Sequence, residues 1–200
     1  MSKYDRQASE RALIEAVGTL IAREGFSGLG VNAIARESGV NKSLIYRYFD
    51  GLDGLYVAFV NSNVLWPTTQ DLLGDVLEWY AAEQWREALV ELQLLYAREL
   101  RARPNTIELL AWECVERNAL TIAFEEVRER RSIELSEAVA AHGFEPPIDL
   151  RPAIAMLASG IHYLLIRSRN INVFGGARVS SDAFWEDELR GVVEALVRGL

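Results

Sequence analysis

The sequence predicts an all-α protein, with a three-helix head at the N-terminus and a larger body of about six helices. Two observations carry this prediction. Apolar residues recur every three or four positions through most of the chain, which is the spacing of one face of an α-helix. The alternating pattern of a strand is confined to the short stretch 171–174. A chain of 200 residues is long enough for one large core or two coupled domains.

The composition is that of an ordinary globular protein, with 50% hydrophobic and 25% charged residues. The polar N-terminus lacks the apolar run of a signal peptide, so we expect a cytoplasmic protein. The longest apolar run, 153–166, is interrupted by Ser159 and His162 and falls short of a membrane span. A single cysteine, Cys114, excludes an internal disulfide and fits a reducing compartment.

Residues 6–24 predict an amphipathic helix, because positions 13, 14, 17, 20 and 21 are apolar. Gly18 lies in its middle. A helical glycine costs about 1 kcal/mol relative to alanine, unless its small size permits a close helix contact.

Residues 25–56 predict two short helices joined by a tight turn. Val31 and Ile34 supply an apolar face for the first helix, and Gly39 can adopt the positive φ that ends it. Asn41 is a good N-cap for the second helix, 42–49.

A helix as short as 42–49 is unstable alone, so its apolar positions Ile45 and Phe49 must pack against neighbouring helices. The remaining positions offer cations, hydroxyls and phenols. A short polar helix behind a glycine-containing turn is the helix-turn-helix arrangement, which places its second helix in the major groove of DNA. The outward-facing residues are Lys42, Ser43, Leu44, Tyr46, Arg47 and Tyr48.

These residues resemble those of the TetR-like one-component transcription regulators. The resemblance covers roughly residues 6–60 and rests on an ordered set of positions: Leu13, Ile14, Ala16, Val17, Leu20, Ile21, Gly25, Phe26, Val31, Ile34, Ala35, Gly39, Val40, Asn41, Lys42, Ile45, Tyr46, Tyr48 and Phe49. It implies a homodimer that binds double-stranded DNA at a near-palindromic operator, and a small-molecule effector bound in the body.

The resemblance also implies roles for the predicted DNA-binding residues. Asn41 joins this set through its predicted capping role, and the resemblance assigns phosphate contacts to Tyr46 and Tyr48. Base-edge positions fall to Lys42, Ser43, Leu44 and Arg47.

Three positions depart from the family pattern. Gly30 replaces the usual Ser or Thr that caps the first helix of the motif and contacts a phosphate, while Asp50 and Leu52 occupy a turn where a cation is common. Because phosphate contacts supply much of the affinity for DNA, these departures predict either weaker DNA binding or greater dependence on Lys42 and Arg47.

The net charge of −8 argues, by itself, against a nucleic-acid partner. Its distribution weakens this argument. Residues 1–63 hold seven Lys or Arg and seven Asp or Glu, so the entire net charge lies in residues 64–200. A neutral DNA-binding head on an acidic body is therefore consistent with the sequence.

The predicted domains are 1–63 for DNA binding, and 64–200 for effector binding and dimerisation. In the body, Trp85, Leu89, Leu92 and Tyr96 form one face of a helix that ends before Pro104. Asn105 and Glu108 have the spacing of a capping box, which predicts a long central helix over about 106–141. Two final helices are predicted over 151–169 and 182–198.

Glu116 interrupts an apolar stripe of the predicted central helix, one turn from Trp112. An unpaired buried carboxylate is costly, so either an internal Arg or Tyr partner, a solvent gap or a bound ligand must satisfy it. The ligand alternative predicts a mostly apolar effector. His162 is either a buried histidine with one hydrogen bond or a ligand contact. The predicted effector site consists of Trp112, Glu116, Tyr96 and His162.

The last two predicted helices carry more apolar side chains than a solvent-facing pair tolerates, which predicts a four-helix dimer contact. The predicted interface consists of Ile154, Leu157, Ile161, Leu164, Leu165, Leu189, Val193 and Leu196.

Catalytic motifs and zinc-ligand spacings are absent from the sequence, so we expect neither an enzyme nor a metal or cofactor site. The leading hypothesis is a transcriptional repressor released from DNA by a small molecule. One alternative is a regulator-derived ligand-binding or interaction module that no longer binds DNA. The other is a helical enzyme, for which no residue constellation is found.

Overall fold

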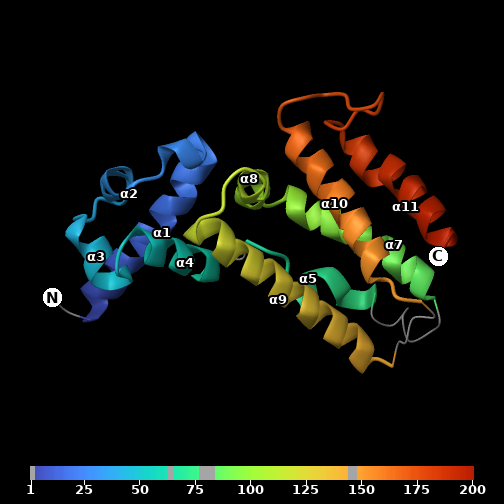
Figure 1. The fold of residues 1–200 in the computed structure, drawn as a ribbon, viewed down its shortest axis with the longest axis horizontal. Helices are drawn as coiled ribbons and strands as arrows, with labels where there is room; N and C mark the ends of the chain where they lie inside the picture. Colours follow the sequence, from blue (N-terminus) through green and yellow to red (C-terminus); the bar gives the residue numbers. More distant parts are fainter. Residues whose placement is uncertain (1–2, 63–64, 77–83, 144–147) are drawn as a thin grey trace. The chain divides into compact units, whose positions relative to one another are not determined.

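The computed structural model describes residues 3–62, 65–76, 84–143 and 148–200, and it confirms the all-α prediction (Figure 1). Within these ranges the only extended pairing is one bridge between Phe174 and Ala177. None of the described helices has the length and apolar content needed to span a bilayer. The helical elements are α1 (Lys3–Glu24), η1 (Phe26–Gly28), α2 (Val31–Ser38), α3 (Ser43–Phe49), α4 (Leu52–Ser62), α5 (Thr69–Leu73), η2 (Gly74–Val76), α7 (Trp85–Arg101), α8 (Pro104–Glu113), α9 (Ala119–Ala141), α10 (Arg151–Ser168), η3 (Phe184–Glu188) and α11 (Leu189–Arg198).

The chain forms two compact units. The first consists of Met1–Leu65 and Pro104–Glu129, and the second of Trp66–Arg103 and Arg130–Leu200. The domain boundary predicted at 63/64 lies outside the described residues. The predicted division also leaves out α8 and the first part of α9, which pack with the head.

Helix α1 is the centre of the first unit, where α2, α4 and α8 all contact it. Its predicted apolar face is buried at Leu13, Val17, Leu20 and Ile21. Gly18 is the point of closest approach, because a Cβ built there would lie 3.1 Å from the ring of Phe59 on α4.

Asn105 also contacts α1 at Gly18. Its Nδ2 donates to the Gly18 carbonyl over 3.3 Å, joining α8 to α1. The predicted capping box at Asn105 is therefore wrong. Helix α8 starts one residue earlier, at Pro104, whose fixed φ suits the first turn of a helix.

The single long helix predicted over 106–141 is also wrong, because α8 ends at Glu113 and α9 begins at Ala119. Asn118 explains the new start: its Oδ1 accepts hydrogen bonds from the amides of Leu120 (3.0 Å) and Thr121 (3.2 Å). The Thr121 hydroxyl accepts in return from the Asn118 amide at 2.9 Å. Apolar spacing does not detect such a break, since the apolar positions of both helices fit one continuous repeat.

Helix α7 is the centre of the second unit and contacts α5, α10 and α11. The face predicted for it is confirmed: Trp85, Leu89 and Leu92 are buried and Tyr96 is half-buried. The helix predicted over 182–198 contains a turn of π-helix, η3, followed by α11. In η3 the Trp185 indole donates to the Val179 carbonyl over 2.8 Å.

Gly54, in the first turn of α4, is the residue whose replacement should damage the head most directly. A Cβ at this position would lie 1.7 Å from the Phe49 carbonyl oxygen, which no side-chain rotation relieves. We expect Gly54→Ala to lower the free energy of unfolding by about 1–3 kcal/mol, in the range of other overpacking substitutions. Urea unfolding followed by circular dichroism measures this change.

Gly191 is the matched control, because it lies inside α11 with open space around its Cβ position. Gly191→Ala should stabilise the protein by about 0.5–1 kcal/mol, the helix-propensity difference between the two residues. Equal effects of the two substitutions would contradict the close packing of α4 against the end of α3.

Candidate nucleic-acid interface

The turn between α2 and α3 has the predicted geometry. Gly39 has a φ of 67°, in the left-handed region that ends α2. The Asn41 Oδ1 accepts from both the amide and the hydroxyl of Ser43, each over 2.9 Å. Asn41 thus accepts from the first amide of α3, but the N-cap position falls on Lys42, one residue later than predicted, because α3 begins at Ser43.

Helix α3 is held by its apolar residues. Ile45 is completely buried and Phe49 is half-buried, and α3 packs on α4. At its C-terminal end Asp50 adopts a left-handed conformation (φ 59°) and its amide donates to the Tyr46 carbonyl over 3.1 Å. The departure at Asp50 thus has a structural role, since aspartate tolerates this conformation better than most residues.

The opposite side of α3 is open to solvent. Lys42, Ser43, Tyr46 and Arg47 are exposed, with Tyr46 at 59%, and they share this side with Asn41. Leu44 and Tyr48 are half-buried and form the edges of the exposed surface. The structure therefore brings all seven predicted DNA-binding residues to one short segment; their contacts with DNA remain a prediction.

Two residues beside α3 escaped sequence analysis. The Asn32 Oδ1 on α2 accepts from the Lys42 ammonium over 3.3 Å, which orients this cation across the turn. The Arg6 guanidinium lies 5.0 Å from the centre of the Tyr48 ring and is also bound to Glu10 at 2.8 Å. Neither contact has a sequence signal, because each joins residues of different structural elements.

Positive charge around α3 is not neutralised internally. Arg36, Lys42 and Arg47 have no ion-pair partner among the described residues. Arg23 differs from them, since it binds both Glu24 and Glu37 over 2.8 Å. The hydrogen bond from Arg23 holds the pKa of the Glu37 carboxyl below its ordinary value. A local excess of unpaired cations favours a polyanion, despite the negative net charge of the chain.

The two remaining departures from the family pattern are at Gly30 and Leu52. Gly30 is the N-cap of α2 in an extended conformation and supplies no side-chain cap. Leu52, the first residue of α4, is half-buried and apolar. The head therefore has fewer side-chain groups for phosphates than the family pattern provides.

The four predicted effector residues are divided between the two units. Trp112, in the first unit, stacks on Phe26 with ring centroids 3.7 Å apart. Tyr96 and His162 are in the second unit, where the Tyr96 hydroxyl and the His162 Nε2 are hydrogen-bonded at 2.5 Å. The edge of the Trp66 ring faces His162, with centroids 5.7 Å apart.

The structural argument for Glu116 is wrong. This residue lies outside any helix, in the exposed link between α8 and α9, so it interrupts no buried stripe. The half-buried acid is Glu113, three residues earlier. Burial raises the pKa of Glu113, an effect that the neighbouring Arg128 guanidinium partly offsets. Arg128 binds the Oε1 atom of this carboxylate directly, whereas Oε2 is buried without a hydrogen-bond partner.

The predicted dimer interface also needs correction. Ile161, Leu165, Leu189 and Val193 are buried within the second unit and are core residues. The reason is that α10 and α11 each turn one apolar face onto α7. Ile154, Leu157 and Leu164 are half-buried, and Leu196 is 55% exposed. Met156 and Val192, 78% and 55% exposed, add to the apolar surface that remains outside.

The family model described as "Bacterial regulatory proteins, tetR family" matches residues 13–59, which contain most of α1 and all of α2 and α3. The head of the chain therefore has the sequence pattern of the TetR family. A repressor of Streptomyces coelicolor, "HTH-type transcriptional repressor SCO4008", is 27% identical over 130 residues, which are 64% of this chain. The match spans 62% of the length of that relative.

Solved structures show the same fold over nearly the whole chain. NalD of Pseudomonas aeruginosa, "the secondary repressor of MexAB-OprM multidrug efflux pump", is 20% identical with a TM-score of 0.64, covering 99% of this chain and 98% of NalD. A regulator from Rhodococcus sp. is 22% identical with a TM-score of 0.58, covering 96% and 99% of the two chains.

The stacked pair Phe26–Trp112 should stabilise the first unit. Replacing either ring with alanine removes apolar contact, and the stack itself contributes about 0.5–1.5 kcal/mol beyond the buried area. We expect a double-mutant cycle of Phe26→Ala and Trp112→Ala, measured by urea unfolding, to give a coupling energy of this size.

Val115 provides the control for this cycle, because it is 82% exposed and lies beyond the end of α8. A cycle of Phe26→Ala with Val115→Ala should be additive. Additivity for Phe26 and Trp112 as well would show that the stack contributes nothing to stability.

Proposed function

We propose that this TetR-family protein is a DNA-binding transcriptional regulator that acts as a repressor. The observation that carries the proposal is the exposed side of α3, where Lys42, Tyr46 and Arg47 face solvent while Ile45 anchors the helix. The printed name of the Streptomyces coelicolor relative, a transcriptional repressor, supports the sign of regulation.

In this proposal α3 enters the major groove of double-stranded DNA. Base edges are contacted from Lys42, Ser43, Leu44 and Arg47, and a thymine methyl suits the apolar Leu44. Tyr46 and Tyr48 contact phosphates on either side. Asn41 keeps the start of α3 in position, and Asn32 holds the Lys42 side chain toward the same surface.

The test is operator binding by charge-removed variants. Lys42→Ala and Arg47→Ala should each weaken binding to the protein's own upstream DNA by about tenfold, in the range of a lost specific contact. If the lost contact is to a phosphate, the slope of log affinity against log salt should flatten by about 0.9. Fluorescence anisotropy at several salt concentrations measures both quantities.

Arg130→Ala is the matched control, since Arg130 is an exposed cation on α9. This variant should bind DNA like the parent. Parental binding by both α3 variants would contradict the assignment of α3 as the recognition helix.

We also propose a two-fold dimer through α10 and α11. Met156, Val192 and Leu196 are exposed apolar side chains on these helices, and Leu157 and Leu164 lie half-buried beside them. A two-fold dimer presents two α3 helices to DNA, so the operator should be a near-palindrome.

A charge placed on this surface should separate the subunits. Leu196→Glu is expected to weaken the dimer by about a hundredfold, because a two-fold contact buries two copies of the new carboxylate. Sedimentation velocity at micromolar concentration should then show a monomer. Ile133→Glu, an equally exposed position on α9, should leave the dimer intact.

The buried residues of the same helices should respond differently. Leu165→Glu puts a charge into the core of the second unit, so it should unfold the protein rather than produce a folded monomer. A dimeric Leu196→Glu protein would exclude this surface as the interface.

We assign DNA binding to residues 1–63, and effector binding and dimerisation to residues 64–200. The effector is proposed to be a mostly apolar molecule that approaches Tyr96 and His162, whose hydrogen-bonded pair supplies polar groups beside the indole of Trp66. Its binding opposes DNA binding, because a ligand shifts two states only through its different affinities for them. Such a regulator works in the cytoplasm, without catalytic chemistry of its own.

A second candidate function follows from Gly30 and Leu52, which provide no side-chain polar group for phosphates. In that case the chain is a TetR-derived ligand-binding or interaction module without an operator. The anisotropy titration separates the two candidates: salt-sensitive, saturable binding to upstream DNA supports the regulator, and its absence at low salt supports the module.

A further inference from the structure

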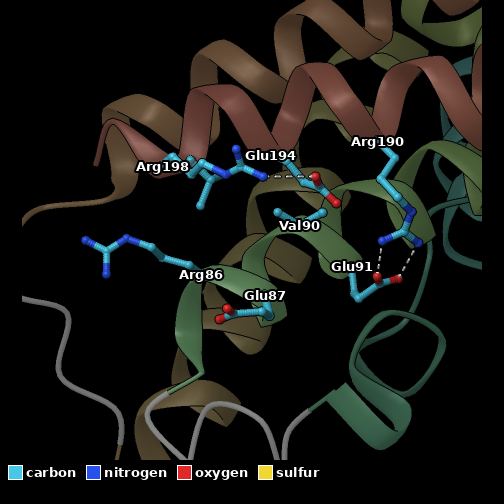
Figure 2. A pocket seen from close by; sticks show the side chains of 8 residues that line it. Arg86, Glu87, Val90, Glu91, Arg190, Glu194 and Arg198 are labelled. Carbon is cyan, nitrogen blue, oxygen red and sulfur yellow. Dashed lines mark hydrogen bonds and ion pairs between the residues drawn. The ribbon is translucent and has the colours of Figure 1, made fainter.

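A charged groove runs along the second unit between α7 and α11 (Figure 2). Its volume is about 410 Å³, within the range of small-molecule sites. The apolar side chains of Val90 and Val197 line it, and both are buried. None of the predicted DNA-binding, effector or dimer residues lines this groove. The remaining lining residues are Arg86, Glu87, Glu91, Arg190, Glu194 and Arg198.

The groove residues of α11 lie on a different side of the helix from its exposed apolar residues. Residues 190, 194 and 198 recur every four positions and form one side of the helix. The side at 189, 193 and 197 is buried, and Val192 and Leu196 are exposed beyond it. At 100° per residue, the groove and the exposed apolar side lie on opposite flanks of the buried one. The groove residues are thus separate from the surface proposed for dimerisation.

One end of the groove is closed by an ion pair. Arg190 binds both carboxylate oxygens of Glu91, as Figure 2 shows, and its side chain is partly buried. The hydrogen bond from Arg190 to Glu91 raises the pKa of the guanidinium. The two side chains together form one wall of the groove.

The other charged side chains of the groove form weak ion pairs or none among the described residues. Glu87 has no hydrogen-bond or ion-pair partner among the described residues, and Arg86 lies over the Trp85 ring at 4.2 Å. Arg198 and Glu194 form a 3.6 Å pair, but their side chains are 79% and 40% exposed. A pair this exposed adds little to stability, so a ligand can replace it at little cost.

We propose that the α7–α11 groove binds an aliphatic α-amino acid. Three arginines and three glutamates line it, so either a simple anion or a simple cation would meet like charges. A zwitterion avoids this conflict: its carboxylate faces Arg86 and Arg198, and its ammonium group faces Glu87 and Glu194. The apolar lining of Val90 and Val197 receives an aliphatic side chain.

Three probes of one carbon skeleton test the charge requirement. L-leucine carries both charges, 4-methylpentanoate only the carboxylate and 3-methylbutylamine only the ammonium. Titration of the intact protein, followed by isotope-edited NMR, should show saturable binding of leucine with shifts at Val90 and Val197. The two single-charge probes should bind at least tenfold more weakly.

Variants test the assigned contacts. Glu87→Gln and Arg86→Gln should each weaken leucine binding about tenfold, whereas Glu126→Gln and Arg130→Gln on α9 should not change it. All four positions are exposed, so the variants should fold like the parent, which circular dichroism verifies. The proposal fails if leucine does not bind, if the three probes bind equally, or if the α9 variants weaken binding as much as the groove variants. Operator binding is measured separately, so its failure leaves this result unaffected.

Discussion

Helix α3 has seven residues, too few for a helix to persist in water through its own hydrogen bonds. Its conformation therefore depends on contacts with the rest of the head. Burying Ile45 contributes about 1.5–3 kcal/mol, comparable to other core side chains. The absence of a side chain at Gly54 lets α4 approach the carbonyl at the end of α3. Because the apolar side of α3 is fixed in this way, its polar side faces solvent in one defined orientation.

The same principle of close approach organises the first unit around α1. At Gly18 the ring of Phe59 contacts the α1 backbone, and Asn105 binds the carbonyl of the same residue. Helices α4 and α8, which are distant in sequence, thus both contact α1 at the same glycine. A side chain at Gly18 would displace the Phe59 ring and the Asn105 amide together, so this residue couples the packing of α8 to that of the head.

Charge is used differently in the two units. Around α3, Arg36, Lys42 and Arg47 form no ion pair with any described residue, as expected for a surface that meets an anionic partner. In the second unit, Arg190 and Glu91 are paired at one end of a groove whose other charges are exposed. A net charge of −8 describes neither surface. Local pairing decides which charges remain available for a ligand.

Sequence alone was sufficient for the all-α class, the helix-turn-helix and the exposed residues of α3, because these depend on local periodicity, capping by Asn41 and the positive φ of Gly39. The tertiary structure decided the rest. Ile161 and Leu165 have the same apolar character as a dimer contact, but α7 covers them within the chain. Glu116 follows the helical spacing, yet Asn118 starts a new helix and leaves it exposed. Apolar periodicity indicates that one face of a helix is buried. Only the tertiary packing determines whether the same chain or a second subunit buries it.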